Sequence, residues 1–180
     1  MFRRVRSVSD GPSRAADGPP PPLTVAASLV GVQGVVLVVL ANAFSLAPPY
    51  LIKRAIEHAP GEAVTVLAHS LGGVACVDLL AMEDLDGRVD QLITVGSQAP
   101  FFYECGALAS VEHPKTLPGH FPRRWLNIYD PWDLLAYRAA KVFPQHASDV
   151  EVSNGQPFPF AHSAYWSNSK VWDAIGTWLD

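Results

Sequence analysis

One segment near the middle of the chain limits the possible folds more than any other. Residues 64–69 read Val-Thr-Val-Leu-Ala-His, an apolar run rich in β-branched side chains that is typical of a buried strand. Ser70 follows at once, and residues 71–80 then carry apolar side chains at helical spacing. The chain therefore passes from a strand to a helix through a turn centred on one serine, which predicts a sheet covered by helices.

The turn has the composition of a nucleophile elbow, in which a strained backbone holds a serine hydroxyl clear of the flanking strand and helix. Such a turn needs small residues two positions before and two positions after the serine. Here these are Ala68 and Gly72, which gives Ala-x-Ser-x-Gly in place of the commoner Gly-x-Ser-x-Gly. We therefore interpret Ser70 as a nucleophile, and Cys76 on the following helix as a small core residue.

The composition is that of one globular domain. The chain has 180 residues, of which 49% are hydrophobic and 17% are charged, and this is enough for a single core. A formal net charge of -4 gives no electrostatic reason to expect nucleic acid as a partner. The two cysteines, Cys76 and Cys105, lack the spacing of a metal site or a disulfide framework.

The N-terminal part of the chain differs sharply from the rest. Residues 1–22 contain four arginines and a Gly-Pro-Pro-Pro-Pro run without apolar periodicity, so we expect a disordered segment. Residues 23–47 are apolar, and no side chain from residue 23 to residue 52 is charged. A short helix near residues 53–58 then leads to the elbow strand.

The apolar segment has three competing interpretations. A transmembrane helix over residues 23–43 fits the length and polarity, and the arginines before it favour a cytoplasmic N-terminus. A secretory signal is the second, because Ala41-Asn42-Ala43 has the form of a small-residue cleavage site. In the third, residues 35–40 are a parallel strand of the sheet, since strands buried on both faces are uniformly apolar. We therefore expect a cytoplasmic or membrane-associated protein.

Two further apolar runs follow the elbow helix and extend the α/β pattern. Residues 91–97 end in Gly-Ser, and residues 124–129 end just before an acidic turn, so both are expected to be parallel strands. A C-terminal helix is expected from about residue 169 to residue 179. The loop over residues 98–103 carries Phe101 and Phe102, which we expect to line a substrate pocket at the same sheet edge as Ser70.

A serine nucleophile in this architecture needs a carboxylate after a late strand, because the carboxylate orients a histidine and stabilises its imidazolium form. Asp130 and Asp133 both follow the run that ends at residue 129. Asp133 is favoured because Pro131 and Trp132 carry the chain beyond the strand end, whereas Asp130 is placed to cap the turn.

The base must follow the acid along the chain in this fold, which leaves His146 and His162. His162 lies in an expected loop just before the C-terminal helix, a placement that suits a base delivered to the sheet edge. His146 lies in a polar stretch and is expected to be a solvated loop residue. His69 is adjacent to the nucleophile, and we expect it to point away from the hydroxyl and to make a structural hydrogen bond.

Four motifs together resemble the α/β-hydrolase superfamily, in its lipase/esterase-like branch, over residues 48–180. The motifs are His69-Ser70-Leu71-Gly72-Gly73, Thr94-Val95-Gly96-Ser97, Trp125-x-Asn127-x-Tyr129-x-x-x-Asp133 and His162-x-x-Tyr165-Trp166. The resemblance implies a partial α/β-hydrolase fold, a mostly parallel sheet flanked by helices. It also implies a triad of Ser70 as nucleophile, Asp133 as acid and His162 as base, with the backbone N–H of Leu71 in the oxyanion hole. No metal or organic cofactor is implied, and water is the usual final acyl acceptor.

The chain departs from this family before the elbow. Family members carry a His-Gly motif on an earlier loop that supplies a second oxyanion donor, and two helices and a strand lie between that loop and the elbow. This sequence has no His-Gly there and room for one helix, so we expect an N-terminally truncated or rebuilt fold. If residues 35–40 are the earlier strand, Ala41, Asn42 or Ala43 would offer the missing N–H.

The sequence therefore predicts a serine hydrolase that cleaves a carboxylic ester or a related acyl bond. The expected partner is a small-molecule acyl ester or a lipid, because aromatic residues follow two of the strands. They are Phe101, Phe102, Tyr103, Trp132 and Tyr137. The alternative is a membrane-anchored or degenerate hydrolase-like protein with little catalytic activity. Neither the substrate nor the oligomeric state can be read from the sequence.

Overall fold

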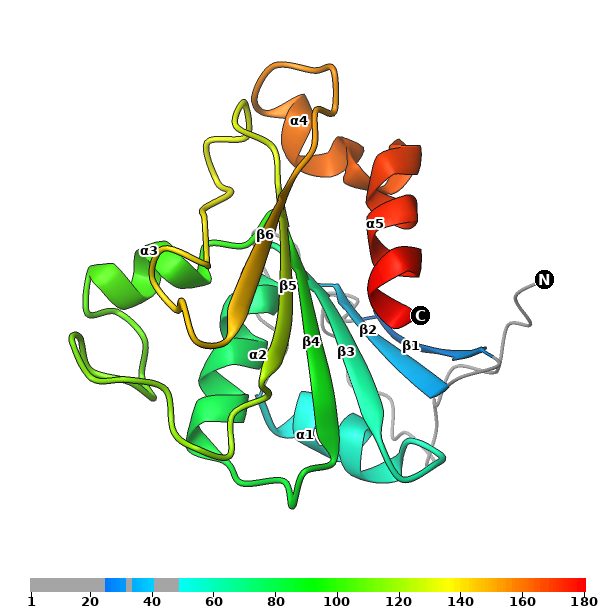
Figure 1. Ribbon diagram of the computed structural model, residues 1–180, viewed down its shortest axis with the longest axis vertical. Helices are drawn as coiled ribbons and strands as arrows, with labels where there is room; N and C mark the ends of the chain where they lie inside the picture. Colours follow the sequence, from blue (N-terminus) through cyan, green and yellow to red (C-terminus); the bar gives the residue numbers. More distant parts are fainter. Residues whose placement is uncertain (1–24, 32–33, 41–48) are drawn as a thin grey trace, which may run out of the picture.

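A six-stranded sheet with strand order β1-β2-β3-β4-β5-β6 organises the computed structural model, which describes residues 25–31, 34–40 and 49–180 (Figure 1). The strands are β1 (Val25–Gly31), β2 (Gly34–Leu40), β3 (Val64–His69), β4 (Val89–Val95), β5 (Arg124–Tyr129) and β6 (Ala147–Glu151). Strands β2 to β6 run parallel to one another, whereas β1 pairs with β2 in the antiparallel sense. The structure thus has the α/β arrangement and the mostly parallel sheet that the sequence predicts.

Helices cover both faces of this sheet. They are α1 (Pro49–His58), α2 (Leu71–Met82), α3 (Ala99–Glu104), α4 (Phe160–Ser163) and α5 (Ser169–Leu179), with a 3-10 turn η1 (Ala164–Ser167) between the last two. The residues of α1, α2 and α3 pack into one core cluster, and those of α5 and η1 pack into another. Helix α5 accordingly lies apart from α1 and α2 in Figure 1.

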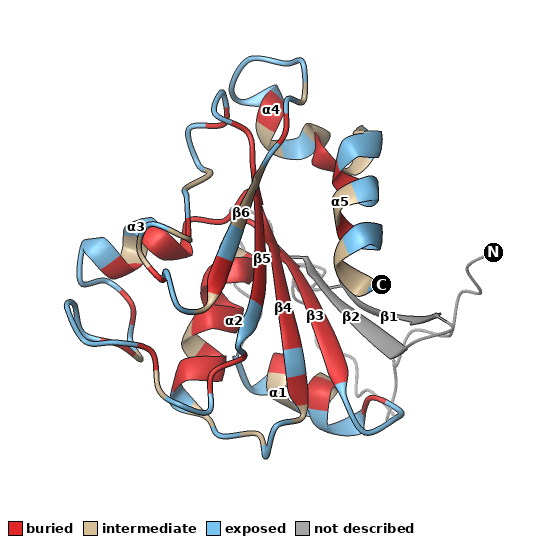
Figure 2. Cartoon of the chain, viewed as in Figure 1, coloured by how far each residue is buried: buried red, intermediate tan, exposed pale blue. Residues whose placement is uncertain are grey.

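The two cores follow from the alternation of side chains along each strand. On β3, Val66 and Ala68 pack toward α1 and α2, whereas Leu67 packs on the opposite face with Val171 and Ile175 of α5. The central strands are therefore buried on both faces, as the red colouring of β3, β4 and β5 shows in Figure 2. Each fully buried aliphatic side chain contributes about 1.5–3 kcal/mol, so these cores fix the strand ends on which the site depends.

The strand at residues 64–69, the helix after Ser70, the strand at 124–129 and the helix at 169–179 are confirmed. The prediction of a loop over residues 98–103 is wrong, because Ala99–Glu104 forms α3 with Pro100 in its first turn. His162 likewise lies on the short helix α4 rather than in a loop. Strand β6 was not predicted, since it is a half-exposed edge strand with the polar sequence Ala-Ser-Asp-Val-Glu.

The apolar N-terminal segment forms two strands where the structure describes it. Residues 34–40 form β2, as the strand interpretation predicts, and residues 25–31 form β1, which was not expected. Within residues 25–31, 34–40 and 49–180, no helix combines the length and hydrophobicity needed to cross a bilayer. The predictions for residues 1–22 and for Ala41, Asn42 and Ala43 lie outside the described residues.

Two glycines with positive φ allow a test of how tightly the sheet edge is packed. Gly96, at the end of β4, has φ 57°, and a Cβ there would lie 2.8 Å from Cε2 of Tyr165. Gly155 has φ 66° but nothing within 4 Å of such a Cβ. We expect Gly155→Ala to lower the free energy of unfolding by about 1 kcal/mol through φ alone, and Gly96→Ala to lower it by about 3 kcal/mol because overpacking adds to the strain. Urea unfolding measures both, and equal losses would contradict the packing argument.

Candidate active site

Ser70 occupies a strained turn between β3 and α2. Its backbone has φ 56° and ψ -130°, a conformation that non-glycine residues rarely adopt. The N–H of Ser70 donates to the carbonyl oxygen of Val95 at 3.0 Å, which ties the turn to the neighbouring strand. Close packing of the next helix requires a glycine at position 73, since a Cβ there would lie 2.7 Å from the Cβ of Ser97. The turn therefore has the backbone geometry expected of an elbow.

The structure brings Ser70, His162 and Asp133 together in one hydrogen-bonded line. Ser70 Oγ lies 2.7 Å from Nε2 of His162, and Nδ1 of His162 lies 2.8 Å from Oδ2 of Asp133. Because Asp133 is an acceptor, Nδ1 carries the ring proton and Nε2 is free to accept from the serine hydroxyl. Ser70 follows β3, Asp133 follows β5 and His162 follows β6, and the carboxyl ends of these parallel strands meet at one sheet edge.

The carboxylate of Asp133 is buried and held by three donors. Its side chain accepts from His162, from the hydroxyl of Tyr165 at 2.9 Å and from the backbone N–H of Leu135 at 3.0 Å. Burial by itself raises the pKa of this carboxyl group, but the hydrogen bonds and the nearby imidazole outweigh burial, so the pKa lies below its ordinary value. Asp133 is therefore ionised at neutral pH and holds His162 in one tautomer.

Tyr165 is a site residue whose contacts sequence reasoning did not foresee. Its fully buried hydroxyl accepts from the backbone N–H of Asp130 at 3.0 Å and donates to Oδ2 of Asp133. Burial, followed by the charge of Asp133, raises the pKa of Tyr165 above its ordinary value. The hydroxyl therefore stays protonated and remains a donor to the acid. The only sequence signal was its position three residues after His162.

Neither of the two rejected candidates makes a hydrogen bond to Ser70 in the part of the chain that the structure describes. Asp130 accepts from the backbone N–H of Trp132 at 2.9 Å and from that of Asn154 at 2.6 Å, so it caps its turn as expected. His146 precedes β6, at the amino end of the strands, where its ring contacts Phe121 and the carbonyl oxygen of Pro122. It is half-buried there, not a solvated loop residue.

His69 supports the helix that carries His162. Its Nε2 lies 2.9 Å from the carbonyl oxygen of His162, and the two rings lie 4.9 Å apart between centroids. Burial lowers the pKa of His69 to about 4, and the neighbouring imidazole of His162 acts in the same direction. The ring is therefore neutral at pH 7, and its Nε2–H donates to the carbonyl oxygen, which is the structural role that the sequence predicted.

The predicted oxyanion donor and the predicted pocket aromatics lie on α2 and α3. Leu71 is the first residue of α2, so its N–H has no acceptor within the helix, and it makes no other hydrogen bond in the described part of the chain. Phe101 is exposed and stacks on Tyr137, whereas Phe102 is half-buried and packs against the core on the α2 side. Tyr103 lies inside that core and does not line the edge.

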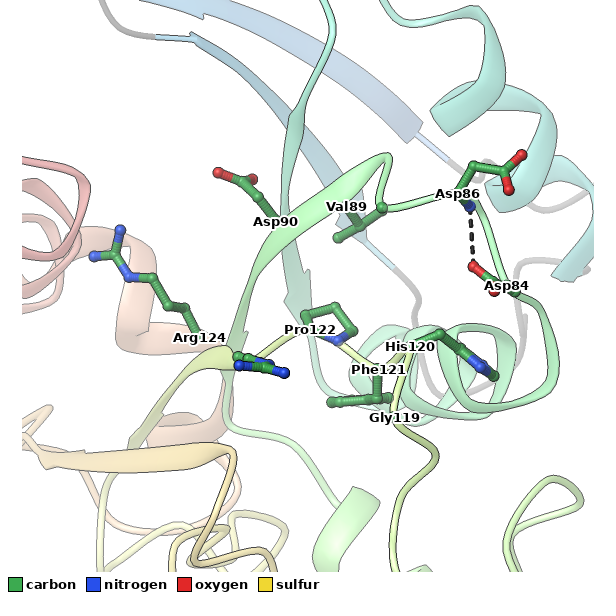
Figure 3. A pocket seen from close by; sticks show the side chains of 11 residues that line it. Asp84, Asp86, Val89, Asp90, Gly119, His120, Phe121, Pro122 and Arg124 are labelled. Atoms are coloured by element: carbon green, nitrogen blue, oxygen red, sulfur yellow. Dashed lines mark hydrogen bonds between the residues drawn. The ribbon is translucent and has the colours of Figure 1, made fainter.

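A depression of about 650 Å³ lies at the opposite edge of the sheet (Figure 3). It is lined by the acidic loop before β4, which includes Asp84 and Asp86, and by residues 119–124 at the start of β5. These residues precede their strands, whereas Ser70, Asp133 and His162 follow theirs. The depression is therefore separate from the serine site.

Both Cys76 and Cys105 are free thiols. Cys76 is buried within the core of α2, and burial raises its pKa to about 12. A thiol that stays protonated at neutral pH is a poor nucleophile, so Cys76 is a packing residue, as predicted.

Comparison with models of known protein families gives no match, and a search of curated proteins finds no similar sequence.

The neutral, buried His69 makes stability depend on pH. Between pH 6.5 and about 4 the unfolded chain binds a proton at His69 that the folded chain does not bind. The free energy of unfolding therefore falls as the pH drops through this window, by up to about 3 kcal/mol from this group. His69→Gln keeps a side-chain donor but does not titrate, so we expect a smaller loss in the variant. Urea unfolding at pH 7 and pH 4.5 measures the difference, and equal losses in both proteins would contradict the assignment.

Proposed function

We propose that this protein is a serine hydrolase of the α/β-hydrolase type that cleaves a carboxylic ester or a related acyl bond. The observation that carries the proposal is the hydrogen-bonded line from Ser70 through His162 to the buried Asp133. A hydroxyl, an imidazole and a carboxylate in this order form the machinery of acyl transfer by serine. The order of the three residues along the chain is that of α/β-hydrolases.

In the first half of the reaction, Ser70 Oγ attacks the carbonyl carbon while its proton moves to Nε2 of His162. The carbonyl oxygen becomes an oxyanion, and the tetrahedral intermediate collapses as the C–O bond to the alcohol breaks. The leaving oxygen takes the proton from Nε2, which leaves an acyl group on Oγ. Water then repeats the sequence with His162 as base, so that the acid is released and Ser70 regains its proton.

Asp133 and Tyr165 act on the imidazole during these steps. The ionised carboxylate keeps the proton on Nδ1 and stabilises the imidazolium that forms when Nε2 accepts the serine proton. Tyr165 donates to the same Oδ2 that faces His162, and it thereby fixes the carboxylate in position. This arrangement needs no reorganisation of the acid as charge develops on the ring.

The backbone N–H of Leu71 is the oxyanion donor that the elbow supplies. As the first residue of α2 it has no intrahelical acceptor, and it immediately follows the nucleophile. Such a donor stabilises the charge that develops on the carbonyl oxygen, and loss of one donor of this kind typically costs about 10²–10³ in turnover.

The residues around the triad favour an apolar acyl group as substrate. Trp132 and Leu134 flank Asp133 along the chain and are 70% and 66% exposed, and Phe160, two residues before His162, is 65% exposed. Exposed apolar side chains this close along the chain to Asp133 and His162 favour contact with an apolar ligand. We therefore propose a small-molecule acyl ester or a lipid as the substrate.

Labelling with a fluorophosphonate probe tests the proposal. We expect the wild-type protein to be labelled on Ser70, and Ser70→Ala to abolish both labelling and ester hydrolysis. Asp133→Asn is expected to lower turnover by about 10⁴-fold, because the amide no longer holds the right tautomer of His162. Ser148→Ala removes an exposed serine of β6 and serves as the matched control with unchanged labelling. A folded wild-type protein that does not react, or labelling that persists in Ser70→Ala, would refute the proposal.

A second prediction concerns the tyrosine behind the acid. Tyr165→Phe removes a donor to Asp133 and leaves the buried N–H of Asp130 without a partner. We expect a loss of about 1–3 kcal/mol in the free energy of unfolding and a fall of about tenfold in kcat. Tyr103→Phe is the control, since it removes another tyrosine hydrogen bond, to the carbonyl oxygen of Lys115. If both variants keep wild-type kcat, Tyr165 has a structural role alone.

A further inference from the structure

Gln98 contacts the nucleophile from the turn after β4, the strand that pairs with the elbow strand β3. It follows β4 and precedes α3, and only 5% of it is exposed. Its Nε2 lies 3.4 Å from Oγ of Ser70. No other side chain in the described part of the chain, apart from His162, makes a hydrogen bond to this oxygen.

The position of the Ser70 hydroxyl hydrogen decides which group donates in the hydrogen bond between Gln98 and Ser70. The single hydroxyl hydrogen of Ser70 faces Nε2 of His162, so Oγ can only accept a second hydrogen bond. The amide nitrogen of Gln98, which carries the hydrogens, is therefore the group that faces Oγ. Within the described residues the other end of the amide, Oε1, is buried without a partner. The side-chain amide thus makes its hydrogen bond to the reacting atom and to nothing else.

The backbone holds this amide on a rigid support. The carbonyl oxygen of Gln98 accepts from the N–H of Phe102 at 3.0 Å, and Oγ of Ser97 accepts from the N–H of Ala99 at 3.2 Å. Ser97 also packs directly on Gly73 of α2, the helix that begins after the nucleophile. Donors fixed in this way stabilise charge without reorganising.

We infer that Gln98 is a further catalytic residue, whose side-chain N–H stabilises the negative charge on Ser70 Oγ as the hydroxyl proton moves to His162. The inference rests on the proposed function. The amide transfers no atom, and its hydrogen bond strengthens as Oγ gains charge and weakens again once Oγ becomes the ester oxygen of the acyl-enzyme. Gln98 therefore lowers the barrier to attack and leaves ground-state substrate binding unchanged.

The test compares Gln98→Met and Gln98→Glu with a control on β4, the strand that precedes Gln98. Methionine keeps the length of the side chain but removes the donor, and glutamate keeps the shape but presents an acceptor to Oγ. Gln91→Met is the matched control, because Gln91, on β4, is also a buried glutamine whose Oε1 has no partner among the described residues, and its Nε2 faces Asp90. The rate constant for inactivation by a fluorophosphonate measures the reactivity of Ser70, and kcat and KM for an ester separate attack from binding.

We expect both Gln98 variants to react about 10- to 100-fold more slowly, somewhat less than the loss of a full oxyanion donor because the contact is long. KM should stay within about twofold, and Gln91→Met should react at the wild-type rate. If the wild-type protein is labelled and Gln98→Met reacts at the same rate as Gln91→Met, this inference is overturned and the proposed function stands. If the folded wild-type protein does not react, both are overturned. If Gln98→Met fails to fold, Gln98→Glu decides, and a wild-type rate in that variant overturns the inference.

Discussion

The buried carboxylate of Asp133 is the constraint on which the rest of the site depends. Moving an ion out of water costs several kcal/mol unless hydrogen bonds replace its hydration, and here the imidazole of His162, the hydroxyl of Tyr165 and the N–H of Leu135 do so. Gly96 makes this arrangement possible, because its missing side chain leaves room for both Tyr165 and the carboxylate at the end of β4. Because buried Asp133 needs the hydrogen bond from His162, this bond also fixes the position of the His162 ring.

The parallel sheet explains how residues far apart in the chain meet. Strands β3, β4, β5 and β6 are followed in turn by Ser70, Gln98, Asp133 and His162, and parallel pairing brings all four strand ends to one edge. The strained backbone of Ser70 costs about 1–3 kcal/mol. Packing on both sheet faces offsets it, since β3 is buried between α2 and α5 and cannot relax without opening both cores. The strained backbone of Ser70 is therefore held in place by packing on both faces of the sheet.

Much of the elbow and the choice of acid and base followed from local pattern. An apolar run of β type followed by a serine and by apolar side chains at helical spacing marks β3, Ser70 and α2. Chain order left His146 and His162, and the position of His162 just before the C-terminal helix favoured it. Strand β6 was not predicted because an edge strand with a polar face has no apolar run. Helix α3 was not predicted because its proline, Pro100, and its three successive aromatic residues resemble a loop. The contacts of Tyr165 and Gln98 could not be predicted, since each depends on where two separate strand ends meet and not on any spacing in the sequence.

The N-terminal strands extend the sheet on the side of β3 that lies away from β4. Strand β2 runs parallel to β3 and its last residue, Leu40, pairs with His69, so β2 ends at the edge where Ser70 lies. In the described residues between these strands only α1 is present, which is the single helix for which the sequence has room. Ser70 therefore has the end of β2 on one side and Gln98, which follows β4, on the other. In the proposed reaction, charge develops on Ser70 Oγ and on the substrate oxygen in the same step, so the N–H of Leu71 after β3 and the amide of Gln98 after β4 act on one transition state.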